Sequence, residues 1–520
     1  MKYESTQFES VVSPEKSIKT ECGVFGIWIP KQGLDNNLNC STITDVIFAG
    51  SLLNQHRGEE SYGLAIGNGQ EVLPPFTEMG LVRSAFQKYK KEGRKMDGHV
   101  GIGHNRYSTT GSSVIENAAP FYAKCESGGV ALGQNGNLVN SPELKQNLDT
   151  LGVQCIGTTD SELMVHTIAN APGDTWEEKI EYTLKSSKGS FSLGIITKDT
   201  LYAARDAFGN RPLFVAMFNR GGKTGYAISS ETQAFNILGD HIRDEILPGE
   251  MLRCNEDGLE RWQWTDDIFE AFCGLELAYL MRADGRFKER TQIDEIRRKL
   301  GYHLALHYPA NNVDYVTYIP ESAKSSAEGY AEGLSNVLGR PVFSRTSMIK
   351  NRYGTLNGSF RGFINPDNSQ RSEIGLSSYS PFDWMIGASI AMVDDSIIRG
   401  NTTSGVVNTT KNRVGNFRNN GAREVHLRIP WPPVKHSCPL GTDIQTADYL
   451  IYRELNENVD EVAKHLGVDS LAFLKPHEFQ EVIDEVVGQH VGLCMGCVTG
   501  VYPPSIGEYT VSKLQLEGTK

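Results

Sequence analysis

A cysteine near the amino terminus has the sequence context of a nucleophile. The stretch Thr20-Glu21-Cys22-Gly23-Val24-Phe25-Gly26 follows a polar leader that has no apolar periodicity. If cleavage after Glu21 makes Cys22 the first residue, its α-amino group becomes the base for its own thiol and no separate histidine is required. The alternative is that Cys22 is a small buried residue at the start of a strand, which is a common role of a free cysteine.

Three polar segments carry the groups that such a thiolate would need to hydrolyse a glutamine side chain. Residues 103–111, 133–137 and 157–162 are each expected as loops, the third capping a helix. The reaction needs a cation for the α-carboxylate, an anion for the α-ammonium and donors for the tetrahedral oxyanion. Arg106, Asp160 and the pair Asn135 and Gly136 have these chemical types. The alternative is a set of ordinary turns and a solvated arginine.

A second group of candidate binding residues follows an apolar run at 386–393, which is expected to form a strand. Asp394 and Asp395 come next, and paired carboxylates bind ribose hydroxyls and a Mg²⁺ that bridges a pyrophosphate. Backbone N–H groups and hydroxyls at a helix amino terminus then offer a monophosphate site. The residues concerned are Arg399, Gly400, Asn401, Thr402 and Thr403. The alternative is that the acidic pair only caps a helix.

Four of the nine cysteines form a third constellation. Cys273 and Cys438 stand alone, and Cys494 and Cys497 form a CxxC motif, so together they supply four thiols for a Zn²⁺ or a [4Fe–4S] cluster. The alternative is that they are packing residues. We expect packing roles for the remaining cysteines without partners at motif spacing, which are Cys40, Cys125, Cys155 and Cys254.

Length and composition limit the kind of protein. A chain of 520 residues exceeds one compact core and predicts two or three domains. The net charge of −12 argues against general nucleic-acid binding, which needs a basic face. The leader lacks an apolar run of signal-peptide length, and no segment has the roughly 18 apolar residues of a membrane span. These features predict a cytoplasmic protein that binds neither nucleic acid nor a membrane.

The hydrophobic pattern changes along the chain. Short alternating strands at 191–196, 201–204 and 226–230, with helical segments between them, predict a layered α/β/β/α sandwich in the first half. Residues 175–178 have the pattern of a capping box. Further on, strands at 314–319, 386–393 and 424–429 alternate with helices, which is typical of a parallel sheet with ligands at the carboxyl ends of its strands.

The motifs of the first half resemble the glutaminase domain of class II glutamine amidotransferases, and more narrowly the glutamine phosphoribosylpyrophosphate amidotransferase family. The resemblance rests on Cys22-Gly-Val-Phe-Gly, Gln55-His-Arg-Gly, residues 103–111, Asn135-Gly-Asn-Leu and Thr159-Asp-Ser-Glu. It implies an amino-terminal-nucleophile fold, cleavage of residues 1–21, Cys22 as the nucleophile, Asn135 and Gly136 at the oxyanion, and Arg106 and Asp160 on glutamine. Asn105 and Gln134 depart from the family pattern.

The second half resembles type I phosphoribosyltransferases. By this resemblance Ser322, Asp394 and Asp395 hold one Mg²⁺, while Lys350 and Arg352 cover the bound sugar pyrophosphate. The chain departs from the family at the inserted residues 354–358 and at 376–380, within the segment that closes over the sugar.

One subgroup of the family places cluster cysteines at the positions of Cys273, Cys438, Cys494 and Cys497, which implies one [4Fe–4S] cluster. The implied domains are a propeptide at 1–21, a glutaminase at 22–265, a parallel α/β phosphoribosyltransferase at 266–470 and a cysteine-bearing extension at 471–520. The implied activity converts glutamine and 5-phosphoribosyl 1-diphosphate to 5-phosphoribosylamine, with ammonia channelled between two sites. Homotetramers and purine nucleotide inhibitors follow from the same resemblance. The alternatives are a paralogue that aminates another phosphosugar and a regulatory relative without activity.

Overall fold

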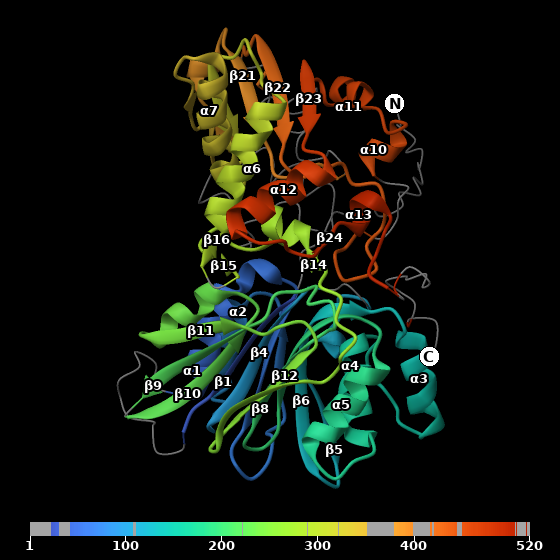
Figure 1. The fold of residues 1–520 in the computed structure, drawn as a ribbon. Coiled ribbons are helices and arrows are strands. Elements are labelled where there is room, and N and C mark those ends of the chain that lie inside the picture. Colours follow the sequence, from blue (N-terminus) through green and yellow to red (C-terminus); the bar gives the residue numbers. More distant parts are fainter. Residues whose placement is uncertain are drawn as a thin grey trace, which may run out of the picture.

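The computed structural model describes residues 22–30, 42–107, 111–220, 222–288, 290–320, 322–350, 379–398, 417–418, 421–444, 450–504, 506 and 516, with the backbone alone at 220, 348–350 and 379–381. The first half of the chain forms two stacked sheets with helices outside them, and the second half forms a parallel sheet beside them (Figure 1).

The first sheet is antiparallel, with strand order β11-β9-β10-β1-β4-β2-β3. Its central strand β1 is buried along its whole length, since both of its faces are covered. Apolar side chains of helix α1 and helix α2 pack on its outer face. The bounds are β1 Gly23–Trp28, β2 Ser61–Gly67, β3 Phe76–Met79, β4 Val100–Arg106, β9 Phe214–Arg220, β10 Lys223–Ser229, β11 His241–Glu245, α1 Ile43–Leu53 and α2 Val82–Lys91.

The second sheet is also antiparallel, with strand order β13-β12-β8-β7-β6-β5, and it is covered by α3, α4 and α5. A core of side chains from both sheets, including Ile102 and Leu201, lies between them. The bounds are β5 Phe121–Cys125, β6 Gly128–Leu138, β7 Gly189–Ile196, β8 Leu201–Arg205, β12 Glu250–Asn255, β13 Gly258–Gln263, α3 Ser141–Thr150, α4 Asp160–Asn170 and α5 Trp176–Ser186. The predicted α/β/β/α sandwich is confirmed.

Local helix signals were predicted correctly. The Thr159 side chain accepts a hydrogen bond from the backbone N–H of Glu162 at the start of α4. Thr175 and Glu178 form the capping box of α5. By contrast, the expected loops at 103–106 and 133–137 were wrong, because these residues are the ends of β4 and β6. The side chains of His104, Arg106 and Gln134 line a pocket, so polar residues stand where a strand normally has apolar ones.

The second half forms a parallel sheet, as the alternating pattern predicted. Its strand order is β18-β17-β21-β22-β23. Helices α6 and α7 pack so closely that a Cβ at Gly301 would lie 1.8 Å from the carbonyl oxygen of Ser326. The bounds are β17 Tyr315–Tyr318, β18 Phe343–Ser344, β21 Ser389–Val393, β22 Glu424–Ile429, β23 Ser470–Phe473, α6 Ile293–His307, α7 Lys324–Leu338, α10 Ile451–Glu454, α11 Val459–Leu466 and α12 Pro476–Val487.

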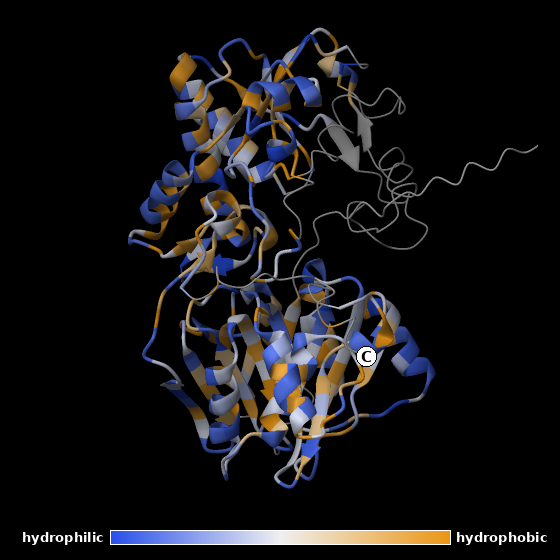
Figure 2. Ribbon diagram, turned by 90° about the vertical axis from the view of Figure 1, so that its right-hand side faces the viewer, coloured by the Kyte–Doolittle hydropathy of each residue, from blue (hydrophilic) through white to orange (hydrophobic). Residues whose placement is uncertain are grey.

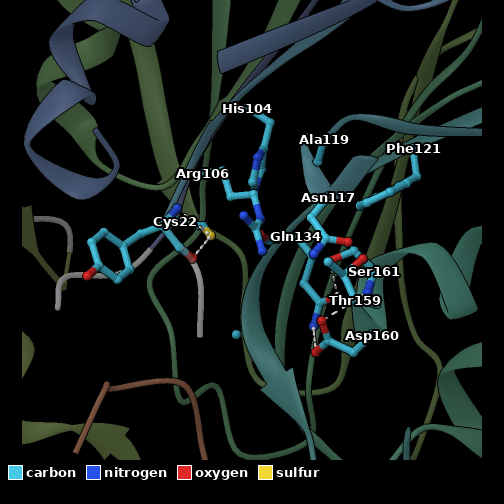
Figure 3. Close-up of a pocket in the computed structure, with 12 residues that line it drawn as sticks. Cys22, His104, Arg106, Asn117, Ala119, Phe121, Gln134, Thr159, Asp160 and Ser161 are labelled. Atoms are coloured by element: carbon cyan, nitrogen blue, oxygen red, sulfur yellow. Dashed lines mark hydrogen bonds between the residues drawn. The ribbon is translucent and has the colours of Figure 1, made fainter. Parts of the chain in front are cut away.

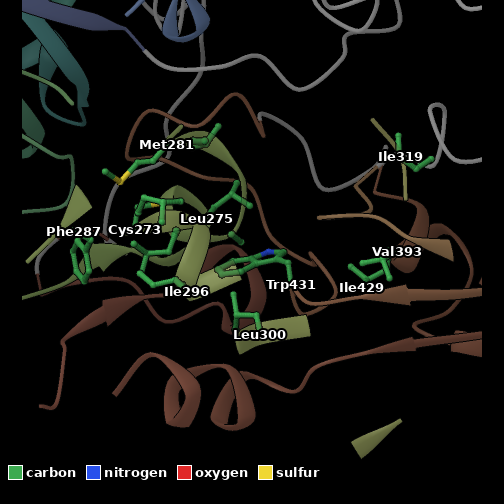
Figure 4. Close-up of a cluster of buried hydrophobic side chains, with 14 of the residues drawn as sticks. Cys273, Leu275, Met281, Phe287, Ile296, Leu300, Ile319, Val393, Ile429 and Trp431 are labelled. Atoms are coloured by element: carbon green, nitrogen blue, oxygen red, sulfur yellow. The ribbon is translucent and has the colours of Figure 1, made fainter. Parts of the chain in front are cut away.

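Short elements join the two halves. Strand β14 (Phe272–Cys273) pairs in parallel with β24 (Leu493–Cys494), and the π-helical turn η4 (Glu276–Leu280) follows β14. A large buried cluster that includes Leu275, Phe287 and Trp431 surrounds this junction (Figure 4). The remaining elements are β15 Arg286–Phe287, β16 Thr291–Gln292, β19 Met348–Lys350, β20 Tyr379–Pro381, α13 Gly496–Thr499 and the 3₁₀ turns η1 Gln55–Arg57, η2 Ile115–Asn117, η3 Thr232–Leu238 and η6 Asp383–Met385.

Hydrophilic residues concentrate on the outward helix faces and in the connections, while hydrophobic residues lie along the strands (Figure 2). Across the described ranges, the helices are all too short or too polar to cross a bilayer.

Candidate active site

Cys22 lies at the start of β1, beside the end of β4. The antiparallel register places Gly23 opposite Asn105, which brings the thiol next to Tyr107. The thiol donates to the carbonyl oxygen of Tyr107 at 3.2 Å, and the Tyr107 N–H donates to Sγ at 3.4 Å. Strand pairing therefore fixes the backbone that follows the nucleophile candidate.

Arg106 and Asp160 face the same pocket as Cys22 (Figure 3). Arg106 is the last residue of β4. Its guanidinium lies 3.6 Å from a carboxylate oxygen of Glu60 and donates a hydrogen bond to the carbonyl oxygen of Ser112. Asp160 is the first residue of α4 and is 4% exposed. The lining of this pocket therefore places a cation and an anion near one thiol.

Gln134 holds the Asp160 carboxylate in position. Its side-chain Nε2 donates to Asp160 Oδ2 at 3.2 Å, and its Oε1 accepts from the Ser161 hydroxyl at 3.0 Å. The N–H of Leu138 also donates to Asp160 Oδ2, at 2.9 Å. The sequence predicted Asp160 but not this role of Gln134, which depends on β6 and α4 being neighbours in space.

Burial dominates the electrostatics of the pocket. It raises the pKa of the Cys22 thiol to about 12, and this rise is opposed by Arg106 and reinforced by Asp160. Burial also raises the pKa of Asp160, against the hydrogen bonds that the carboxylate accepts. It lowers the pKa of His104 to about 4, so this imidazole is neutral at pH 7. With residue 21 attached, the thiol is therefore protonated at neutral pH.

Asn135 and Gly136 lie near the end of β6. Gly136 lines the pocket, has φ +149°, and a Cβ there would lie 2.1 Å from the carbonyl oxygen of Ser190, so only glycine is accommodated. The Asn135 side chain is fully buried, and neither its oxygen nor its nitrogen has a hydrogen-bond partner among the described residues. Asn135 is not among the residues that line the pocket, whereas its neighbours Gln134 and Gly136 are.

A buried charge network connects the backbone of Cys22 to the second half of the chain. Arg57 Nε donates to the carbonyl of Cys22 at 3.0 Å. Its terminal nitrogens contact Glu231 at 2.6 Å and Glu276 at 2.7 Å, and Glu276 lies 3.7 Å from Arg211. Burial alone would raise the pKa of Glu231, but the contacts of its carboxylate with His56 and Arg57 hold this pKa well below its usual range. The sequence did not predict this network, because its members are far apart along the chain.

The predicted metal residues of the second half meet at the carboxyl ends of β17 and β21. These strands are parallel neighbours, and the Ser322 hydroxyl donates to an oxygen of Asp395. Asp394 and Asp395 are both 6% exposed. Burial raises the pKa of Asp395, against the Ser322 hydrogen bond and the nearby Arg297. The three residues thus offer a compact set of oxygen donors.

Several predicted sugar-binding residues cannot be placed. Only the backbone of Lys350 is described, at the end of β19. Arg352, Arg399, Gly400, Asn401, Thr402 and Thr403 lie outside the described residues, as do the departures from the family pattern at 354–358 and 376–378.

The four predicted cluster cysteines gather at the junction between the two halves. Pairing of β14 with β24 sets Cys273 opposite Cys494. Burial raises the pKa of Cys497 well above its usual value, and Cys438, Cys273 and Cys494 add to this rise, which marks all four as electrostatic neighbours. None forms a disulfide.

The comparisons cover both halves of the chain. A family described as a glutamine amidotransferase domain matches residues 104–236. An amidophosphoribosyltransferase of Synechococcus elongatus is 38% identical over 501 residues, covering 95% of this chain and 94% of that protein.

Two solved structures superpose on nearly the whole fold, each with a TM-score of 0.79. One is described as a glutamine phosphoribosylpyrophosphate amidotransferase from B. subtilis complexed with ADP and GMP, is 31% identical, and covers 94% of this chain and 99% of its own. The other is described as the allosteric regulatory enzyme of purine biosynthesis, is 33% identical, and covers 94% and 98%. These matches support the predicted amidotransferase over the two alternatives. The chain belongs to the amidophosphoribosyltransferase family of enzymes.

Proposed function

We propose that the chain converts glutamine, water and 5-phosphoribosyl 1-diphosphate to glutamate, 5-phosphoribosylamine and pyrophosphate, the first step of purine synthesis. The observation that supports it most is the convergence of Cys22, Arg106 and Asp160 on one buried pocket. Membership in the family assigns the reaction class, and the pocket supplies groups of the required charge for glutamine.

In the glutaminase, removal of residues 1–21 gives Cys22 a free α-amine, which takes the proton of the thiol. This step matters because burial keeps the thiol protonated at neutral pH. The thiolate attacks the glutamine Cδ, the amide nitrogen receives the proton and leaves as ammonia, and water hydrolyses the thioester to glutamate. Arg106 binds the α-carboxylate and Asp160 binds the α-ammonium.

The oxyanion of the tetrahedral intermediate is bound by the Asn135 amide and the Gly136 N–H. The support is the buried Asn135 amide, which lacks a partner within the described chain, and the position of Gly136 in the pocket wall. Donors that are already fixed in place need no reorganisation when the negative charge develops.

Ser322, Asp394 and Asp395 are the proposed Mg²⁺ residues. Two buried carboxylates and a hydroxyl are oxygen donors of the type that Mg²⁺ prefers. When bound, Mg²⁺ neutralises charge on the pyrophosphate leaving group. The carboxylates orient the ribose, and ammonia from the glutaminase displaces pyrophosphate from C1. Roles for Lys350, Arg352 and residues 399–403 on the phosphates stay predictions.

Cys273, Cys438, Cys494 and Cys497 are the proposed ligands of one [4Fe–4S] cluster. The support is their proximity: Cys273 lies opposite Cys494 in paired strands, and the electrostatics of Cys497 include the other three thiols. The proposed role of the cluster is structural, at the junction between the two halves.

The remaining family expectations are also proposals. The domain limits 22–265, 266–470 and 471–520 are proposed from the family, and β23 (Ser470–Phe473) of the parallel sheet spans the last of these limits. Homotetramers and control by purine nucleotides rest on the family, in which the B. subtilis relative was described with ADP and GMP.

The proposal is tested with amide-¹⁵N-labelled glutamine and 5-phosphoribosyl 1-diphosphate in excess unlabelled ammonium. We expect pyrophosphate release with ¹⁵N in the phosphoribosylamine. Pyrophosphate release with only unlabelled product would contradict channelling, and glutamine hydrolysis that never yields pyrophosphate would contradict the proposed acceptor.

A further inference from the structure

Three metal-ligating side chains converge outside both proposed sites. The sulfur of Cys155, a carboxylate oxygen of Glu162 and a ring nitrogen of His166 all lie within 4.8 Å of one another. Glu162 is buried, and the other two residues are partly exposed. The sequence predicted only a packing role for Cys155 and did not predict its proximity to Glu162 and His166.

The backbone presents these groups from two segments. Glu162 and His166 are one turn apart on α4, so their side chains share a helix face. Glu162 also fixes the loop that carries Cys155, because its two oxygens accept from the N–H groups of Ile156 and Gly157, both at 2.8 Å. A carboxylate has further lone pairs, so these hydrogen bonds leave capacity for an ion.

The thiol and the imidazole are otherwise unused. Among the described residues, neither the Cys155 thiol nor the His166 ring makes a hydrogen bond. Partly buried polar groups usually find partners. Here the other members of the cluster lie within 4.8 Å of each of these two groups.

We propose that Cys155, Glu162 and His166 form a binding site for a divalent transition-metal ion of the zinc class. Sulfur, nitrogen and oxygen donors together suit Zn²⁺, whereas Mg²⁺ prefers oxygen ligands. A thiolate, a carboxylate and a neutral imidazole balance the charge of a divalent ion. Three protein ligands leave one position for water, which makes the ion exchangeable.

Such an ion would clamp the loop before α4 onto the helix. This loop leads directly into Thr159 and Asp160, which line the pocket of Cys22. Thr158 within it is held by Asn117, another pocket residue, through a hydrogen bond of 2.7 Å. The clamp is separate from the proposed chemistry and does not depend on it.

The test measures alkylation of Cys155 in the full-length protein, with any iron–sulfur cluster intact, by residue-resolved mass spectrometry with and without ZnCl₂. At a free Zn²⁺ concentration ten times its dissociation constant, we expect about tenfold slower alkylation. Cys125, which is also partly exposed but lies outside the cluster, is the internal control and should not change. Protection below twofold at saturating Zn²⁺ would overturn the proposal.

Two further arms assign the protection to the site. His166→Gln should remove the protection of Cys155, while His303→Gln, a partly exposed histidine on α6, should retain it. Magnesium chloride at the same concentration should not protect. Protection that survives in His166→Gln, or that Mg²⁺ reproduces, would contradict a zinc-class site made by these three residues.

Discussion

Gly441, from the second half of the chain, lies directly against Gly136 in the wall of the pocket that contains Cys22. A Cβ at Gly441 would come within 3.1 Å of the carbonyl carbon of Gly136. The neighbouring carbonyl of Leu440 accepts hydrogen bonds from Ser190 at 2.6 Å and from Arg211 at 2.7 Å. Residues next to the proposed cluster ligand Cys438 therefore brace the strand that carries the proposed oxyanion site.

This contact predicts the effect of Gly441→Ala. Gly441 has φ +108°, and a side chain there would strain the backbone by about 1–3 kcal/mol and press on Gly136. We expect about tenfold lower kcat/KM for glutamine and an unchanged ammonia-dependent rate. Gly488→Ala is the matched control, because Gly488 has φ +77° with no atom nearby. Equal losses in the two variants would refute a specific brace.

Removal of the proposed oxyanion donor should change kcat and KM for glutamine to different extents. Asn135→Ala should lower kcat for glutamine hydrolysis by about 10²–10³ and leave KM nearly unchanged, because the donor acts on charge that develops in the transition state. Steady-state glutaminase assays measure both constants. A rise in KM at constant kcat would instead place Asn135 in ground-state binding.

The Arg57–Glu276 pair predicts a stability effect. Glu276→Gln leaves Arg57 and Arg211 with less buried counter-charge, and breaking a buried pair costs about 3–5 kcal/mol. Glu260→Gln, which breaks the exposed pair with Arg253, should cost less than about 1 kcal/mol. Denaturant unfolding compares the two variants, and similar midpoints would show that the network does not stabilise the junction.

The pH dependence of glutamine hydrolysis tests the base. Burial raises the pKa of the thiol to about 12, whereas an α-amine titrates near 7.7–8.0. The amine accepts the thiol proton only in its neutral form, so kcat/KM should rise with pH through about 8 and be lost below it. A midpoint above about 9 would indicate direct ionisation of the thiol and no role for the amine.

The sequence predicted features that depend on local rules or on motifs. The capping box at Thr175 and the strand that leads to Asp394 follow from spacing within a few residues. The polar ends of β4 and β6 were interpreted wrongly as loops, because Arg106 and Asn135 occupy strand positions where apolar residues are normal. Contacts such as Gly441 with Gly136 join segments some 300 residues apart, and no local pattern reports them.

The central claim is that one chain contains two separable reactions. Cys22→Ala should abolish glutamine-dependent pyrophosphate release while ammonia-dependent release continues at the wild-type rate, because Ser322, Asp394 and Asp395 are untouched. The measurement is pyrophosphate release with each nitrogen donor, and Asp395→Asn is the reciprocal variant, expected to lose both. Loss of the ammonia-dependent rate in a folded Cys22→Ala protein would contradict the two-site account.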